Sequence, residues 1–408
     1  MGEPDGAALA AFDLAALPAG FTDDPYAWYR ALRERDPVRL MPDGSLFLTR
    51  HADCEAVYRD TRVFGSDKKA EFGAKYGAGT PLFQHHTTSL VFNDPPLHTR
   101  VRRLIAGALT PRAISDLEPG LVALVDHLLD DMAARGEADL IEDFAAAIPV
   151  EIIGNLLDVP HADRAPLRGW SLAILGALEP RLSPAQEAAG NAAVTEFLAY
   201  LEGLVADRRA RPGDPERDVL TRLIVGEGEG ERLSPAELLH NCIFILNAGH
   251  ETTTNLIGNG LHLLATLPGE RARLLADPDL MRFAVEEVLR YESSNQLGNR
   301  TANAATEIGG RAVAAGTRIT LCIGAANRDP AAFADPERFD AGRTPNRHLA
   351  FGQGAHQCAG LSLARLEGRV ALSRFLGRFP AYELAGPPTR GGRARFRGFS
   401  ALPARLRP

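Results

Sequence analysis

The chain has 408 residues, and its 45 Lys and Arg against 52 Asp and Glu give a formal net charge of −7. With 45% hydrophobic and 24% charged residues it has the composition of a globular protein, which excludes a disordered chain, a collagen-like fibre and a coiled coil. The mild acidity argues against nucleic acid as the main partner.

The four cysteines indicate a reducing, cytoplasmic compartment. They are widely spaced, and no pair has the C-x-x-C spacing typical of zinc or redox sites. We expect Cys54, Cys242 and Cys322 to be small buried hydrophobes. The sequence opens without a basic segment followed by an apolar stretch, and no run reaches 18 apolar residues. We therefore expect neither a signal peptide nor a membrane contact.

The first hundred residues predict short elements. Asp23 or Asp24 caps a helix that ends near Arg35, with Pro25 in its first turn. Two strands follow around the hairpin turn Asp43-Gly44, and residues 51–60 favour a helix. Residues 66–92 have weak periodicity, which predicts a long loop of the kind that is often functional.

Residues 97–267 are mostly helical in pattern, and one helix is unusually long. Ser234 caps it, Pro235 occupies its first position, and no proline follows before Pro268. A helix over 280–291, short strands, a Pro/Arg-rich meander over 329–347, a helix over 360–379 and a strand-like tail complete the chain. We expect one large, mainly α domain over residues 1–408 with a small β region.

The segment Phe351-Gly-Gln-Gly-Ala-His-Gln-Cys358-Ala-Gly360 carries the strongest chemical signal. Its three glycines allow a tight turn around Cys358, which then enters a helix whose free N–H groups and dipole favour a thiolate. Phe351 is placed to cover the sulfur and keep water away. The alternative interpretation is a Gly-rich turn with a buried cysteine.

This segment resembles the haem-binding loop of the cytochromes P-450, the haem-thiolate monooxygenases. The resemblance implies a triangular, mainly helical fold with b-type haem between the long central helix and the cysteine helix. It also implies that Cys358 is the axial ligand of the iron. The residues implied to contact haem in this loop are Phe351, Gly352, His356 and Gly360.

A second motif lies in the middle of the long helix, at residues 248–253. Ala-Gly-His-Glu-Thr-Thr resembles the oxygen-activation signature of the same family. By that resemblance Ala248 and Gly249 let haem and dioxygen approach closely, while Glu251 and Thr252 relay protons. An acid in an apolar helix is costly unless it has a role or a partner. The alternative is a helix kink at which a threonine bonds to the preceding turn.

Two further motifs match the family. Glu287 and Arg290 lie on one helix face at i, i+3, which from spacing alone indicates a surface ion pair. In the family E-x-x-R is a buried structural pair, and Arg338, Arg343 and His348 are open as its third member.

His98 and Arg102, at i, i+4, present two cationic donors suited to a carboxylate. The resemblance implies that both, with Arg300 and His356, hold the haem propionates. The alternative is a solvated basic helix face.

The resemblance implies a monooxygenase that inserts one atom of O2 into a small to medium organic substrate. We expect a monomer that receives electrons from a separate ferredoxin and ferredoxin reductase, which would dock near Arg100, Arg103, Arg347 and Arg365. A peroxide-driven or oxidative-coupling relative and a non-catalytic haem sensor are the alternatives. By family topology the substrate pocket includes residues near 172–178 and Phe83, His86, Leu90, Val91, Phe244, Gln296, Leu297 and Phe399.

Overall fold

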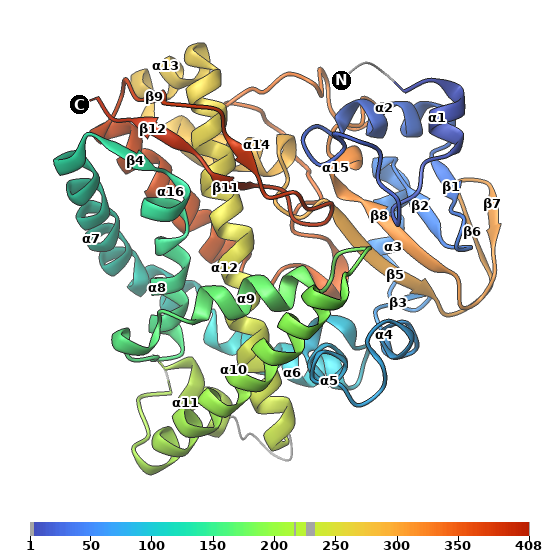
Figure 1. Cartoon of the computed structure of the whole chain (residues 1–408), viewed down its shortest axis with the longest axis horizontal. Coiled ribbons are helices and arrows are strands. Elements are labelled where there is room, and N and C mark those ends of the chain that lie inside the picture. The colour runs from blue at the N-terminus through green and yellow to red at the C-terminus, as the bar shows by residue number, and fades with distance from the viewer. Residues whose placement is uncertain (1–3, 216–217, 226–232, 408) are drawn as a thin grey trace.

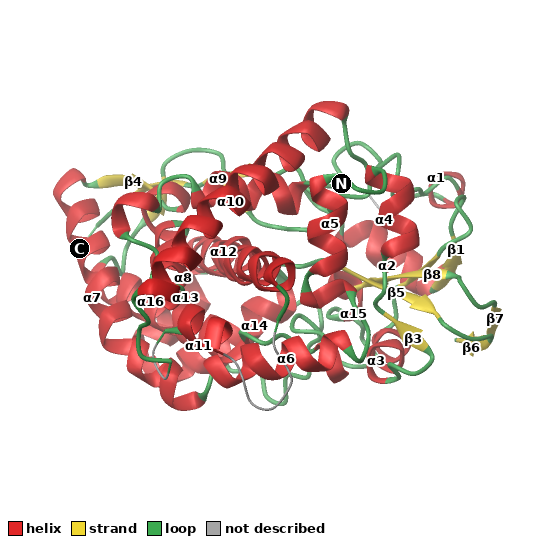
Figure 2. Cartoon of the chain, turned by 90° about the horizontal axis from the view of Figure 1, so that it is seen from below, coloured by secondary structure: helices red, strands yellow, loops and turns green. Residues whose placement is uncertain are grey.

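One long helix runs through the middle of the molecule (Figures 1 and 2). The structure, a computed structural model, describes residues 4–215, 218–225 and 233–407. The central helix is α12 (Pro235–Thr266). The Ser234 hydroxyl accepts from the backbone N–H of Glu237, whose carboxylate accepts from the backbone N–H of Ser234. This reciprocal cap fixes the start of the helix where the sequence predicts it.

The other helices pack around α12 and along the molecule. Four that pack directly against α12 are α8 (Ala147–Leu156), α9 (Leu167–Gly176), α14 (Met281–Tyr291) and α16 (Leu361–Arg378). The remaining helices are α1 (Gly6–Ala10), α2 (Tyr26–Arg35), α3 (His51–Arg59), α4 (Lys69–Tyr76), α5 (Pro81–Thr88), α6 (Leu97–Ala108), α7 (Pro111–Arg135), α10 (Pro184–Ala210), α11 (Val219–Val225), α13 (Pro268–Ala276) and α15 (Ile323–Ala326).

The main β-sheet lies at one end of the molecule (Figure 1). Its strand order is β1-β2-β8-β5-β3, antiparallel except for the parallel pair β2–β8. Its strands are β1 (Val38–Leu40), β2 (Leu46–Leu48), β3 (Phe64–Gly65), β5 (Leu297–Ala302) and β8 (Arg318–Cys322). The smaller sheets contain β4 (Glu137–Asp139), β6 (Thr306–Ile308), β7 (Arg311–Val313), β9 (Glu383–Leu384), β10 (Thr389–Arg390), β11 (Phe399–Ala401) and β12 (Pro403–Arg405).

The predicted loop over residues 66–92 is wrong, because α4 and α5 lie there, followed by a 3₁₀ turn at 90–92. Phe72, Tyr76 and Leu82 are buried in the main core, so tertiary packing stabilises helices whose local pattern is weak. Thr80 caps α5 through a bond from the backbone N–H of Phe83. The first long helix begins at Tyr26, two residues after the predicted cap.

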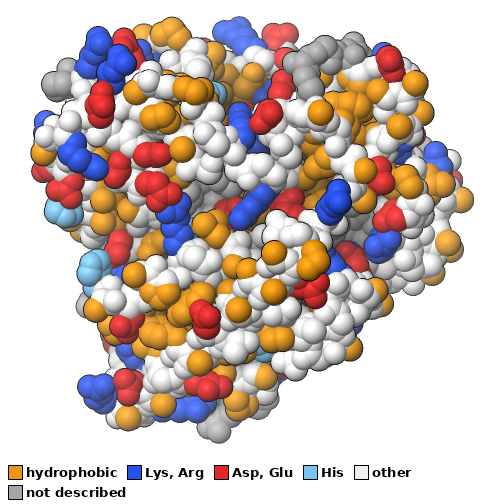
Figure 3. Space-filling view, in the orientation of Figure 1, with side chains coloured by type: hydrophobic (Ala, Val, Ile, Leu, Met, Phe, Trp, Pro, Cys, Tyr) orange, Lys and Arg blue, Asp and Glu red, His pale blue; other side chains and the backbone are white. Residues whose placement is uncertain are grey.

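A single large hydrophobic core extends from Phe72 to Leu406 and includes residues of α12 and α16. Smaller clusters lie under the main sheet and around α2. The outline is broad at the top and narrow at the bottom, and charged side chains of both signs are mixed over the visible face (Figure 3). The mainly α fold with a small β region is thus confirmed. Within the described residues, no helix is both long and apolar enough to cross a membrane.

Candidate active site

The loop before α16 holds Cys358 near the amino-terminal end of that helix. Gly352 and Gly354 have φ angles of +60° and +70°, a backbone region that L side chains rarely adopt. A Cβ atom at Gly354 would also lie 2.6 Å from the carbonyl oxygen of Tyr58. The backbone N–H of Cys358 donates to the carbonyl of Phe351 at 2.8 Å, which closes the loop. The tight turn therefore requires glycine at both positions.

The thiol of Cys358 borders a cavity of about 350 Å³ lined by residues of α12, α16 and β5. Burial raises the pKa of this thiol, while the backbone N–H of Gly360 and the guanidinium groups of Arg102 and Arg365 oppose that shift. The predicted stabilisation of a thiolate is therefore outweighed by desolvation. The protein alone favours the protonated thiol, and a bound metal cation would displace that proton.

The protein supplies no complete metal site of its own. Within residues 4–215, 218–225 and 233–407, no group of three or more His, Cys, Asp or Glu side chains is arranged to hold a metal ion. Cys358 therefore suits a metal whose other ligands come with a cofactor. The buried Cys54, Cys242 and Cys322 are fully enclosed in the core, as predicted, and none borders the cavity.

Part of the motif at residues 248–253 lies on the same cavity. Ala248, Gly249 and Thr252 all line it from α12. The Thr252 hydroxyl donates to the carbonyl of Ala248 at 2.8 Å, the back-bonding that was the alternative interpretation of this motif. A Cβ atom added at Gly249 would overlap the side chain of Ile153, so this glycine also lets α8 pack closely on α12.

Glu251 lies behind the cavity wall rather than on it. Its side chain is buried and forms an ion pair with Arg393, and its second carboxylate oxygen has no hydrogen-bond partner within the described structure. Burial raises the pKa of Glu251 to about 7, and Arg393 limits that rise. Arg393 also lines a separate outer pocket. The carboxyl is therefore linked through Arg393 to the outer pocket, and its pKa suits proton exchange near neutral pH.

A group of His and Arg side chains lines the cavity near Cys358. His98, Arg102, Arg300 and His356 all border it, and the rings of His98 and His356 are 3.9 Å apart. Burial and the neighbouring cations lower the pKa of His98, and they lower that of His356 to about 2. Both ring nitrogens of His98 and the Nε of Arg300 are buried without a partner in the described structure. The group thus offers unused donors to an anion.

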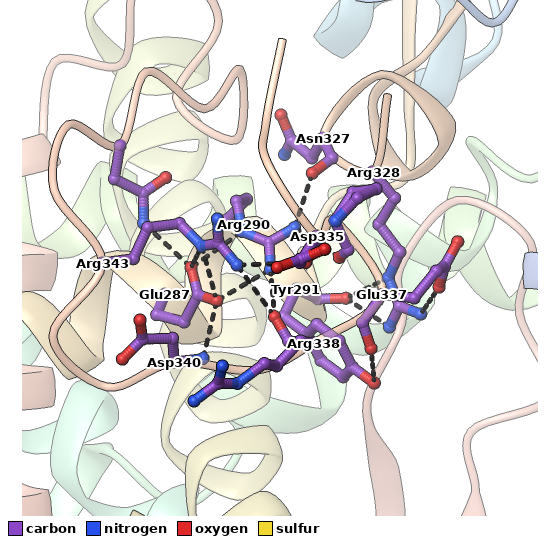
Figure 4. Close-up of polar contacts among 12 residues, drawn as sticks. Glu287, Arg290, Tyr291, Asn327, Arg328, Asp335, Glu337, Arg338, Asp340 and Arg343 are labelled. Carbon is purple, nitrogen blue, oxygen red and sulfur yellow. Dashed lines mark hydrogen bonds and ion pairs between the residues drawn. The ribbon is translucent and has the colours of Figure 1, made fainter. Parts of the chain in front are cut away.

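The Glu287–Arg290 pair is fully buried, with both side chains at 0% exposure (Figure 4). All five N–H groups of the Arg290 guanidinium donate hydrogen bonds. Two bonds of 2.7 Å reach the carboxylate of Glu287, and three of 2.8–3.1 Å reach the carbonyls of Asn327, Pro336 and Arg338. The pair therefore connects α14 to the segment over residues 327–338, which includes the first part of the meander.

Arg343 is the third member of this cluster. Its Nε donates to both carboxylate oxygens of Glu287 at 3.0 and 3.1 Å. Arg338 contributes only its backbone carbonyl, and His348 binds Glu286 instead. The structure thus settles a choice among three residues that spacing leaves open.

The sequence matches a family model described as Cytochrome P450 over residues 178–389, which is more than half of the chain. It is also 34% identical over 368 residues to the biotin biosynthesis cytochrome P450 of Bacillus subtilis (strain 168), a match that covers 90% of this chain and 91% of that relative. The chain belongs to the cytochrome P450 family.

Other comparisons agree with this assignment. The chain is 36% identical to the 6-deoxyerythronolide B hydroxylase of Saccharopolyspora erythraea, over 95% of this chain and 97% of the relative. Its fold superposes on the crystal structure of CalO2 with a TM-score of 0.90 at 31% identity, covering 98% and 99% of the two chains. The protein is therefore a cytochrome P450 monooxygenase, an enzyme of a haem-thiolate family.

The residues around the cavity fit this cofactor. One cysteine without protein co-ligands suits the axial position of an iron held by a macrocycle. The unpartnered donors of His98 and Arg300 suit the carboxylates that haem carries. All the residues predicted to contact haem line the cavity: His98, Arg102, Ala248, Gly249, Arg300, Phe351, Gly352, His356, Cys358 and Gly360.

The predicted substrate-pocket residues divide into two sets. Leu90, Val91, Phe244 and Leu297 line the cavity. The other four are absent from its described lining: Phe83, His86, Gln296 and Phe399.

The local packing of three of these residues explains the difference. His86 packs in an aromatic cluster on α4 and α5, where its ring lies 5.3 Å from that of Phe72. The amide of Gln296 donates to the backbone of Ser293, and the ring of Phe399 lies 4.6 Å from that of His262. Each of these side chains therefore makes its contact outside the cavity wall.

Leu175 and Leu178 line the cavity, within the region expected near 172–178. Sequence reasoning missed other residues that complete the cavity: Ile153 on α8, and Arg395 and Phe396 in the segment before β11. Arg395 and Phe396 belong to no motif, and only the tertiary fold brings them to the cavity.

Proposed function

We propose that this cytochrome P450 inserts one atom of O2 into a small to medium organic substrate, with Cys358 as the axial ligand of b-type haem. The arrangement of the Cys358 thiol and the Thr252 hydroxyl on one largely apolar cavity carries this proposal. Haem, when bound, supplies the redox centre at which dioxygen is reduced and oxygen is transferred. Arg102 and Arg300 would hold its carboxylates by charge, His98 and His356 would hold them by hydrogen bonds, and Phe351 would shield the sulfur.

The protein's own contribution to turnover is proton delivery and exclusion of water. Glu251 takes up protons next to Arg393 and the outer pocket. Thr252, whose hydroxyl lies at the cavity wall, then passes them into the cavity. A carboxyl with a pKa of about 7 both takes up and releases a proton at working pH. We therefore assign Glu251 and Thr252 as the proton relay.

Electrons come from a separate ferredoxin and its reductase in this proposal. Of the four arginines predicted to form the docking face, Arg103 and Arg347 have exposed side chains, and Arg100 and Arg365 form ion pairs with Glu237 and Glu286. An acidic carrier would therefore meet a face of moderate positive charge, and its affinity should fall as salt rises. We also propose that the protein is a monomer and that it is cytoplasmic; the four free thiols support the cytoplasmic location.

An isotope experiment tests this function. The holoprotein is supplied with NAD(P)H, ferredoxin and reductase under ¹⁸O₂, using a compound that a spectral-shift screen identifies as a ligand. We expect a product with one ¹⁸O atom and no product without the electron donors. Oxidation that needs only hydrogen peroxide would favour the peroxide-driven alternative. Haem binding without any turnover would favour the sensor.

A further inference from the structure

Besides the His and Arg side chains near Cys358, the largely apolar cavity has a second polar region, which we call its polar end. Ser294, Asn295 and Asn299 line it around the start of β5, and Arg395 lines it from the segment before β11. The two segments are held together by the bridge between Asn295 and Phe396 and by a hydrogen bond of 2.8 Å from the backbone N–H of Arg397 to the carbonyl of Ser294. This polar end is therefore a fixed part of the cavity.

The guanidinium of Arg395 is bound only by neutral acceptors. It donates to the carbonyls of Leu178 at 3.1 Å and Leu297 at 2.7 Å, and to the amide oxygen of Asn299 at 2.5 Å. These bonds use three of its five N–H groups. Within the described structure no carboxylate oxygen lies within 4.0 Å of this guanidinium. Burial lowers its pKa, and the charge of Glu179, whose carboxylate accepts from the backbone N–H of Arg395 at 3.2 Å, is the largest influence that opposes this shift.

The neighbouring arginines differ in this respect. Arg393 forms an ion pair with Glu251, and Arg397 forms one with Glu292. Buried charges in proteins are normally paired, because an unpaired charge loses its hydration without compensation. Arg395 is half-buried, and it is the one arginine of these three with no carboxylate oxygen within 4.0 Å of its guanidinium.

A second unused group lines the same polar end. The Ser294 side chain is 5% exposed, and its hydroxyl has no hydrogen-bond partner in the described part of the chain. The amide oxygen of Asn295 is also buried without a partner. A free hydroxyl donor and two free guanidinium N–H groups at one end of an apolar cavity match the acceptor oxygens of a carboxylate.

We propose that Arg395 and Ser294 bind a carboxylate of the substrate, which makes the substrate an organic acid whose apolar body lies against Leu90, Phe244 and Leu297. This inference rests on the proposed function, because it names the substrate class of the same cavity. A neutral acceptor such as an ester or an amide would leave the charge of Arg395 uncompensated. It should therefore bind more weakly.

The test compares ligands that differ only in charge. Dodecanoic acid, dodecanamide and methyl dodecanoate, and 4-phenylbutanoic acid with its amide, are titrated into the holoprotein at pH 7.5. Binding is read from the haem spectrum and by equilibrium dialysis. We expect the acids to bind about 10–100-fold more tightly than their neutral analogues, the range for a hydrogen-bonded charge. Equal affinities, or no binding of either acid, would overturn the inference.

Variants locate the effect. R395Q should abolish the preference for acids, and R395K should retain part of it, since lysine keeps the charge but not the planar fork. S294A should weaken the acids and leave methyl dodecanoate unchanged, so it decides the matter if R395Q fails to fold. R181Q is the matched control, because Arg181 is exposed on the outer pocket. An unaltered preference in R395Q, or a loss equal to that in R181Q, would refute the assignment.

The two proposals fail separately. Before each titration, a separate sample of the same protein is reduced and mixed with CO. The long-wavelength Soret band of a thiolate-ligated haem is recorded on that sample. If that band is absent, the proposed function fails. If it is present and the acids show no preference, only the substrate class is wrong.

Discussion

Replacing Glu287 by Ala should destabilise the protein more than replacing Arg290. Without Glu287, the guanidinium groups of both Arg290 and Arg343 lose their counter-charge. Without Arg290, the carboxylate of Glu287 still has Arg343 and the backbone N–H of Asp340. Each substitution nevertheless leaves a buried charge with fewer partners, and breaking a buried pair on one side typically costs about 3–5 kcal/mol.

The structure places these substitutions near the upper part of that range. Both side chains are at 0% exposure, so water cannot replace the lost partner without rearrangement. Arg290→Ala also leaves the carbonyls of Asn327, Pro336 and Arg338 without this donor. A loss of about 4–5 kcal/mol is a large share of a stability of about 5–15 kcal/mol. We therefore expect little soluble, haem-loaded protein from either variant.

An exposed pair provides the control. Arg374 and Asp126 also form a two-bond ion pair, but each side chain is 41% exposed. Arg374→Ala should cost less than about 1 kcal/mol. Urea unfolding followed by circular dichroism gives the free energy of unfolding of all three variants, with haem content measured in parallel. Equal losses for Arg290→Ala and Arg374→Ala would refute the reasoning.

Three further predictions concern the site. Thr252→Ala and Glu251→Gln should keep NAD(P)H consumption but lower product per NAD(P)H and raise hydrogen peroxide. Losing a proton relay lowers the rate of the step it serves on the order of 10²–10⁴-fold. Unchanged coupling in both variants would exclude them from the relay. Because burial raises the pKa of Glu251 to about 7, its carboxyl holds a proton below about pH 7 and loses it above. Coupling in the wild type should therefore fall above that pH, and a similar fall in Glu251→Gln would exclude this carboxyl as its cause. Arg300→Leu should speed haem release, whereas Arg318→Leu, a half-exposed control on β8, should not; equal release rates would contradict a propionate contact.

The long helices were predictable because their signals are local. Ser234, Pro235 and Glu237 form a complete cap before a continuous apolar pattern, and the structure has that cap. Helices α4 and α5 were not predictable in this way, although Thr80-Pro81 is a start signal. They depend on the burial of Phe72 and Leu82 by residues distant in sequence.

The site residues also differ in whether a local motif or only the tertiary fold places them at the cavity. Residues in compact motifs, such as Cys358 and Thr252, reach the cavity as expected. The segment over 391–397 has no motif, yet it provides Arg393 to Glu251 and Arg395 to the cavity. The pocket prediction at Phe399 fails for a related reason, because pairing of β11 with β10 places that ring against His262, while Phe396 borders the cavity.

The CO complex of the reduced protein tests the central assignment most directly. With Cys358 as the axial ligand, the wild type should show the long-wavelength Soret band of a thiolate-ligated haem. Cys358→Ser should fold and bind haem but lack that band, and Cys242→Ala should keep it. A wild type without the band, or Cys358→Ser with it, would contradict the assignment of Cys358.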